Sequence, residues 1–126
     1  MNSKRKENKG TLVWDAGASR LLQESARNAG YKIIAVNPLD KTSGDRLIAS
    51  KYAQGRFPVV TSDRTAWKEM LVEKGATAIV CIKNPRKEDF GIIKKKLESF
   101  LKKSTANSLR GYIWTVSVTK VDKKKI

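Results

Sequence analysis

The segment Pro58-Val59-Val60-Thr61-Ser62-Asp63 decides the fold that we expect for this chain. It is a run of β-branched residues that ends in a turn-forming Ser-Asp pair, and it predicts a strand over residues 58–61. The run does not alternate between polar and apolar residues, and three of the expected strands share this character. Strands of this kind are buried on both faces, so they favour a mostly parallel sheet that lies between helices.

Strands and helices alternate along the rest of the chain. Apolar residues at helical spacing predict the helices, and short apolar runs predict the strands. The expected strands cover residues 11–14, 32–36, 58–61, 78–82 and 111–118, and the expected helices cover about residues 19–29, 45–54, 65–74 and 87–103. Together they predict an α/β fold, a three-layer α/β/α sandwich with a mostly parallel five-stranded sheet.

Two of these elements carry finer expectations. Ser19 is placed to cap the N-terminus of the first helix, with Leu21 and Leu22 on the buried side of that helix. The last strand alternates in hydropathy, which is typical of a half-exposed edge strand. Its Tyr112 and Trp114 are open to two interpretations, packing against the sheet or stacking on a nucleic-acid base.

The chain is expected to form one domain, because 126 residues is a common size for a single core. Residues 1–10 are predicted to be a basic disordered arm, residues 11–119 the folded domain and residues 120–126 a basic C-terminal tail. No apolar run reaches the roughly 20 residues that span a bilayer. The N-terminus also lacks the apolar centre of a signal peptide. We therefore expect a cytoplasmic protein with no membrane partner.

The composition excludes several kinds of site. The chain has 27 Lys and Arg against 12 Asp and Glu, a formal net charge of +15, and no histidine. Without histidine, a Ser-His-Asp triad, a Cys-His nucleophile and a His-ligated zinc are excluded. Cys81 is the single cysteine, which excludes a disulfide within the chain, and we expect it to be an inert buried residue. The remaining chemistry rests on carboxylates, hydroxyls, lysines or a metal ion held by oxygen.

Three aspartates are placed at the carboxyl ends of the expected strands. Asp15 and Asp63 directly follow strands, and Asp45 opens the helix after the second strand. Ligands of open parallel sheets bind at this rim, and grouped carboxylates suit a hard cation such as Mg²⁺ or Mn²⁺. A structural role is the alternative for two of them, because Asp63 could cap its helix and Asp45 could lie in a first turn.

The segments around the three aspartates occur in a recognisable order. They are Leu12-Val13-Trp14-Asp15, then Gly44-Asp45-Arg46-Leu47-Ile48 with Ala53 and Gly55-Arg56, then Val59-Val60-Thr61-Ser62-Asp63-Arg64. This order resembles a PIN-like domain, closest to the small single-domain group related to toxin-type ribonucleases, over about residues 11–119. The resemblance implies a Mg²⁺- or Mn²⁺-dependent endoribonuclease whose acidic cluster is Asp15, Asp45 and Asp63.

The resemblance also implies roles for other residues and for partners. Hydroxyl hydrogen bonds from Thr61 or Ser62 would help to hold the site. If the chain is the toxin of a toxin–antitoxin pair, an antitoxin-like protein would cover the site. A homodimer is also compatible with the sequence.

The chain departs from the usual PIN-like pattern at three positions. Ala16-Gly17, Arg46 and Thr65 stand where the family often has further acids. Arg46 and Arg64, each beside an aspartate, could contact a phosphate and would compete with a cation. The alternative function is therefore a catalytically inactive nucleic-acid-binding module on the same fold. A phosphate-accepting receiver domain is disfavoured, because the chain lacks the acid pair before the first strand.

Basic residues are densest towards the C-terminal half of the chain. Residues 83–110 carry nine Lys or Arg and three acids. The fourth helix contributes lysines that we expect on its outer side: Lys94, Lys95, Lys96, Lys102 and Lys103. A solvated helix face is the simpler interpretation of such a run. The charge of the whole chain favours RNA or another nucleic acid as the partner.

Overall fold

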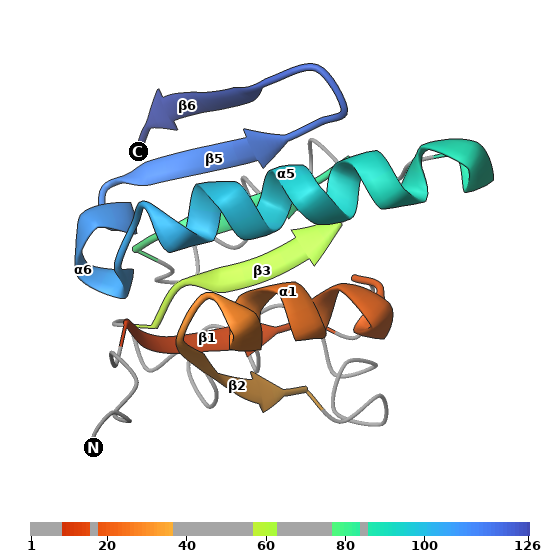
Figure 1. Ribbon diagram of the computed structural model, residues 1–126. Helices are drawn as coiled ribbons and strands as arrows, with labels where there is room; N and C mark the ends of the chain where they lie inside the picture. Colours follow the sequence, from red (N-terminus) through yellow and green to blue (C-terminus); the bar gives the residue numbers. More distant parts are fainter. Residues whose placement is uncertain (1–8, 16–17, 37–56, 63–76, 84–85) are drawn as a thin grey trace.

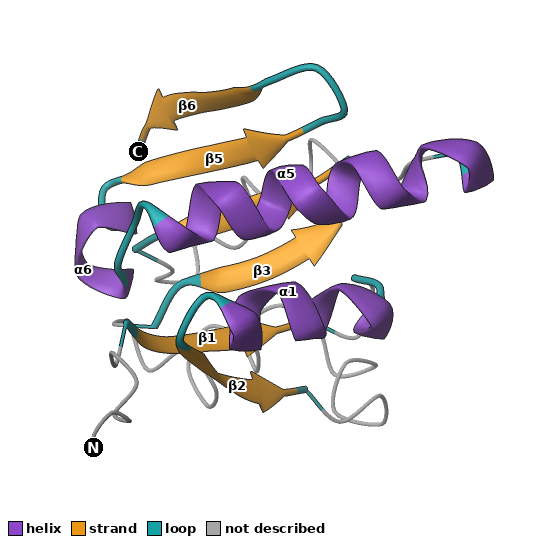
Figure 2. Cartoon of the chain, viewed as in Figure 1, coloured by secondary structure: helices purple, strands orange, loops and turns teal. Residues whose placement is uncertain are grey.

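The fold is built on one six-stranded sheet (Figures 1 and 2). The computed structural model describes residues 9–15, 18–36, 57–62, 77–83 and 86–126. Its strands are β1 (Gly10–Trp14), β2 (Tyr31–Ala35), β3 (Val59–Ser62), β4 (Ile79–Ile82), β5 (Tyr112–Val116) and β6 (Val121–Lys125). Its helices are the 3-10 turns η1 (Arg20–Leu22) and η3 (Lys87–Asp89), and α1 (Gln23–Asn28), α5 (Phe90–Lys102) and α6 (Ala106–Leu109).

β1 and β3 lie side by side at the point where the order of the strands in the sheet reverses. The sheet runs β2-β1-β3-β4-β5-β6, and all pairs are parallel except β5 with β6. From β1 the chain goes to β2 on one side and then returns to β3 on the other side. In open parallel sheets such a reversal leaves a crevice at the carboxyl ends of the two strands. Asp15 and Asp63 directly follow these two strands in the sequence, and of the two only Asp15 is among the described residues.

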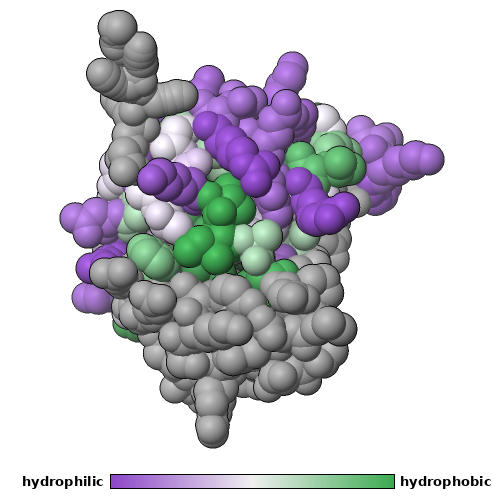
Figure 3. All heavy atoms as spheres, turned by 90° about the horizontal axis from the view of Figure 1, so that it is seen from below, coloured by the Kyte–Doolittle hydropathy of each residue, from purple (hydrophilic) through white to green (hydrophobic). Residues whose placement is uncertain are grey.

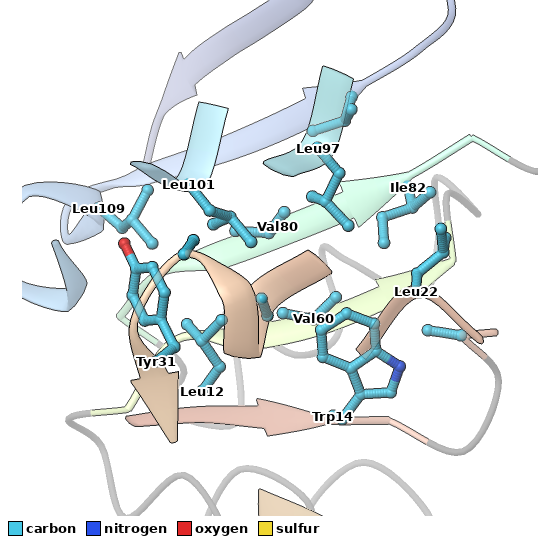
Figure 4. Close-up of a cluster of buried hydrophobic side chains, with 14 of the residues drawn as sticks. Leu12, Trp14, Leu22, Tyr31, Val60, Val80, Ile82, Leu97, Leu101 and Leu109 are labelled. Atoms are coloured by element: carbon cyan, nitrogen blue, oxygen red, sulfur yellow. The ribbon is translucent and has the colours of Figure 1, made fainter. Parts of the chain in front are cut away.

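The described helices α1 and α5 cover one face of the sheet (Figure 1). Side chains from the strands and helices form the main core, in which Trp14, Leu97 and Leu101 are almost fully buried (Figure 4). The opposite face of the strands is also buried, with Val59 and Cys81 fully inaccessible to solvent. Burial of both faces is compatible with an α/β sandwich, and it explains the unbroken apolar runs of the central strands.

The first helical segment begins as a 3-10 turn, and this changes which leucine is buried. Ser19 caps the turn as expected, because its hydroxyl accepts a hydrogen bond from the backbone N–H of Leu21 at 3.2 Å. The tighter winding turns Leu21 outward, where it is 70% exposed, while Leu22 enters the core. The prediction that both leucines face inward was therefore wrong for Leu21.

The C-terminal residues that we expected to be a tail form the sixth strand. β6 pairs with β5 in antiparallel register, from Val116 opposite Val121 to Tyr112 opposite Lys125. The turn between the two strands is closed by Ser117, whose backbone N–H donates to the carbonyl of Lys120 at 3.0 Å. The sheet thus has one strand more than predicted, and β5 is half-exposed but is not at the edge of the sheet.

The N-terminal side of β1 is also tied to the rest of the fold. Residues 1–8 lie outside the described residues, but Lys9 donates from its backbone N–H to the carbonyl of Gly30 and accepts from the backbone N–H of Ala106. Gly10 begins β1 with a φ of 116°, a conformation that favours glycine. Of the basic arm predicted for residues 1–10, the last two residues therefore belong to the sheet and its contacts.

The outer edge of the sheet at β2 carries apolar side chains. Ile33 and Ile34 are only partly buried, between the exposed residues Lys32 and Ala35. Figure 3 views the molecule from the side on which β2 lies in Figure 1, and it shows apolar side chains next to hydrophilic ones. The helices predicted over residues 45–54 and 65–74 lie outside the described residues.

Candidate functional site

Asp15 lies where β1 ends, at the carboxyl-terminal edge of the sheet. It is fully buried, and its backbone N–H donates to the carbonyl of Val60 in β3 at 2.8 Å. Its own carbonyl accepts a hydrogen bond from the backbone N–H of Ala18 at 2.9 Å. The preceding Trp14 donates from its indole Nε1 to the carbonyl of Ser19 at 3.1 Å. These hydrogen bonds hold Trp14 and Asp15 in place at the end of β1.

A hydroxyl from the neighbouring strand contacts this carboxylate. Thr61 Oγ1 donates to Asp15 Oδ2 at 2.6 Å, and both residues are fully buried. Hydrogen bonds to a charged acceptor are shorter and stronger than those between neutral groups. Burying a carboxylate is costly unless it is paired or coordinated, so this bond offsets part of the cost of placing Asp15 inside the protein.

Of the other residues expected at this site, one is described by the structure and the rest lie outside the described ranges. Ser62, the last residue of β3, is almost completely buried at the same end of the sheet. Asp45, Asp63, Arg46 and Arg64 lie outside the described residues. Within the described ranges, no three His, Cys, Asp or Glu side chains are grouped so that they could hold a metal ion. The described part of the expected site is therefore Asp15 with Thr61, and Ser62 beside them.

The lysines of α5, together with Lys103 at its C-cap, divide into two groups. Lys94 donates to Glu24 Oε1 at 3.0 Å, and Lys102 Nζ lies 3.2 Å from Glu98 Oε2. These two ion pairs are exposed and therefore weak. The first directs Lys94 towards α1, and the second directs Lys102 along the surface of α5. The other three lysines that we expected to bind nucleic acid line a groove instead: Lys95, Lys96 and Lys103.

The groove lies between α5 and β6 and has a volume of about 560 Å³. Apolar and hydroxyl-bearing side chains complete its lining: Ile92, Ser99, Phe100 and Val121. Among the described residues that line it, the charged ones are all lysines. Lys96 also donates to the carbonyl of Thr119 at 3.3 Å, which links the helix to the turn before β6. We call this feature the α5–β6 groove.

Aromatic side chains lie beside the groove. The rings of Phe100 and Trp114 have centroids 5.2 Å apart, and those of Tyr112 and Trp114 are 5.6 Å apart. Lys123 Nζ lies 4.6 Å from the centroid of the Tyr112 ring and 5.4 Å from that of Trp114. Trp114 also donates from Nε1 to the carbonyl of Leu109 at 3.0 Å. Packing therefore holds these rings in place, with a cation over them.

Sequence reasoning missed the contribution of β6 to this surface. Lys123 and Lys125 lie opposite Trp114 and Tyr112 in the strand register, so they share the face that α5 covers. The available signal was the alternating strand that precedes them, because a short turn after such a strand often returns the chain as a hairpin. The Asp-Lys-Lys-Lys sequence of residues 122–125 hid this signal, since charged residues are depleted in strands.

Comparisons with known proteins identify no relative of this chain. The chain matches no protein-family model, and searches of curated proteins and of solved structures also find no match. In the described residues, the helices are too short or too polar for any of them to cross a lipid bilayer.

Proposed function

We propose that this chain is a PIN-like, metal-dependent endoribonuclease whose site is built around Asp15. The observation that carries the proposal is the position of Asp15, buried at the carboxyl end of β1 beside the point where the strand order reverses. This is where open parallel sheets bind their ligands. The net charge of +15 supports an RNA substrate, because it attracts a polyanion to the protein.

In this proposal the aspartates would bind the cation, and a neighbouring hydroxyl orients one of them. Asp15, together with Asp45 and Asp63, would hold Mg²⁺ or Mn²⁺, since hard cations prefer carboxylate oxygens. When bound, the cation supplies charge neutralisation at the phosphodiester and lowers the pKa of a water. Thr61 orients the Asp15 carboxylate through its hydrogen bond of 2.6 Å. Asp15 fits this role by its chemistry and its place at the strand end.

Cleavage of a single-stranded RNA by the purified chain tests this proposal. We expect activity with Mn²⁺ or Mg²⁺, none with excess chelator, and a loss of activity in Asp15→Asn and in Asp63→Ala. Asp122→Asn is the matched control, because Asp122 is an exposed aspartate on β6 that pairs with Lys120. A thermal shift on addition of Mn²⁺, present in the wild type and absent in Asp15→Asn, would detect binding of the cation without reference to activity.

Two results would reject the enzyme. One is a wild-type protein that does not cleave RNA with either cation, and the other is an Asp15→Asn variant that cleaves as fast as the wild type. The α5–β6 groove with its three lysines favours the second candidate, a module on the same fold that binds nucleic acid without cleaving it. Salt-sensitive RNA binding that persists without cleavage would support this candidate.

A further inference from the structure

We infer that the α5–β6 groove binds a single-stranded nucleic acid, with its phosphates on the lysines and its bases or sugars against the apolar floor. The inference rests on the proposed function only in taking a nucleic acid as the partner. It places binding on the side of the molecule formed by α5 and β6, at the opposite edge of the sheet from β2. Asp15 does not line the groove.

The charge of the groove favours a polyanion. Lys95, Lys96 and Lys103 line it, and Lys123 lies next to its aromatic side. From Lys95 to Lys103 the helix rises about 12 Å, because each residue adds about 1.5 Å. The cations thus follow a line instead of gathering at one point, which suits the repeating charges of a backbone. Lys96 donates to Thr119, and an ammonium group has three donors, so the same side chain can also bind a phosphate.

The floor of the groove distinguishes a single strand from a duplex. Ile92 is 51% exposed although it is apolar, and Phe100 and Val121 are only partly buried. Unpaired bases present flat apolar faces that pack against such side chains, whereas the bases of a duplex are stacked on one another and offer only phosphates and groove edges. An apolar floor therefore adds affinity for a single strand and adds little for a duplex.

The aromatic pair beside the groove provides a second contact for bases. Lys123 covers the rings of Tyr112 and Trp114, and exposed cation–π contacts of this kind are weak. A base that stacked on these rings would displace the ammonium group, which could then reach the phosphate of the same nucleotide. Trp114 is held by Leu109 and Phe100, so its ring is already oriented before the nucleic acid binds.

Equilibrium binding of short labelled oligonucleotides tests the inference. We would measure fluorescence anisotropy with an oligouridine of about 12 nucleotides, the matching oligothymidine and a duplex of equal length. The protein carries Asp15→Asn and the buffer contains chelator, so that cleavage does not affect the result. We expect both single strands to bind more tightly than the duplex, and a comparison of the two shows whether RNA is preferred over DNA.

Two charge-reversal pairs separate the groove from the overall charge. Lys95→Glu with Lys123→Glu should weaken binding by about tenfold or more, and should reduce the slope of log affinity against log salt by about 0.7 for each phosphate that is no longer bound. The matched control is Lys32→Glu with Lys124→Glu, which changes the net charge equally. Lys124 neighbours Lys123 but points to the other face of β6, and Lys32 is exposed on β2. The control should stay within about threefold of the starting protein once salt is matched.

A third variant tests the apolar floor. Ile92→Ser keeps the charge and changes an exposed side chain, so we expect it to fold and to lose affinity for the single strands but not for the duplex. Equal weakening by both charge pairs, equal affinity for duplex and single strand, or competition by polyglutamate as strong as that by unlabelled oligonucleotide would each overturn the inference. The last result would identify acidic protein segments as the occupant. These outcomes are independent of cleavage, so they leave the proposed nuclease untouched.

Discussion

Thr61 Oγ1 and Asp15 Oδ2 lie 2.6 Å apart, and the two residues are 46 positions apart in the sequence. The hydrogen bond joins the ends of β1 and β3, the two strands between which the sheet reverses its order. The bond can form only once these strands have paired, because the two residues are too far apart in the sequence to meet within one local element. The orientation of the Asp15 carboxylate is therefore a property of the sheet and not of the segment that carries it.

Replacing Thr61 with Val should destabilise the protein by about 1–3 kcal/mol, because it keeps the shape but removes a hydrogen bond from a buried carboxylate. Thr61→Ser keeps the hydroxyl and should cost about 1 kcal/mol, the effect of removing one methyl group. Urea denaturation of both variants measures these free energies of unfolding. A cycle that combines Thr61→Val with Asp15→Asn should show that the two changes are not additive. Additive effects would mean that the bond contributes little.

The hydroxyl of Tyr31 makes stability sensitive to alkaline pH. It lies 3.2 Å from Ser104 Oγ in the core between β2 and the end of α5. Burial raises the pKa of Tyr31 above its ordinary value of 10.0, and the hydrogen bond with Ser104 lowers it in part. The folded protein therefore holds this proton more tightly than the unfolded chain. Its contribution to stability is complete below the unfolded pKa and is lost as pH rises through the folded pKa.

Tyr31→Phe isolates this contribution. We expect the free energy of unfolding of the wild type to fall above about pH 10, and to fall less steeply in the variant. At neutral pH the variant should be less stable by about 1 kcal/mol, because it loses the hydrogen bond with Ser104. Chemical denaturation at several pH values provides the comparison. Parallel pH profiles for the two proteins would show that Tyr31 does not cause the alkaline loss.

Two glycines should respond in opposite ways to replacement by alanine. Gly10 has a φ of 116°, and a Cβ placed on it would lie 2.5 Å from Ala106 Cβ. Gly10→Ala should therefore destabilise the protein by about 1–3 kcal/mol. Gly91 lies in α5, and a Cβ there would meet no atom within 4 Å. Gly91→Ala should stabilise the protein by about 0.5–1 kcal/mol, since alanine favours a helix. Thermal denaturation of both variants measures the two changes in stability. A Gly10→Ala protein as stable as the wild type, or a Gly91→Ala protein less stable than it, would contradict the prediction.

Removal of residues 120–126 should destabilise the domain, because these residues form a strand. The truncation leaves β5 paired with β4 alone, exposes Tyr112 and Trp114, and removes Val121, which packs against the core. The loss of the Val121 side chain alone costs about 1 kcal/mol. Urea denaturation followed by tryptophan fluorescence would measure the loss. Lys124→Thr serves as the control, since it alters an exposed position of β6 and keeps the strand. A truncated protein as stable as this control would indicate that β6 contributes nothing to folding.

The sequence was sufficient to predict the first five strands, because each has a strong local signal. The ends of β1, β2, β3 and β4 lie within one residue of the expected positions, and α5 lies within the range expected for the fourth helix. These elements have apolar residues at a clear period, so burial and local preference agree. The position of Asp15 at a strand end followed directly from this agreement.

Other features depended on contacts that no local pattern reveals. β6 contains three consecutive lysines and forms a strand because β5 offers it an unpaired edge. Leu21 faces solvent because its segment begins with a 3-10 turn, whose period differs from that of an α-helix. Lys94 is separated from the groove-lining lysines by its ion pair with Glu24, which belongs to another helix. Each of these outcomes was decided by tertiary structure.

The three lysines of β6 have a consequence for self-association. An edge strand exposes backbone N–H and C=O groups that can pair with a strand of another molecule. Lys123, Lys124 and Lys125 place positive charge on both faces of this edge, so a second copy that approached it would bring like charges together. Repulsion of this kind opposes the joining of two sheets through β6, and it is strongest at low ionic strength. The strand that completes the sheet therefore also protects it from being extended by another copy.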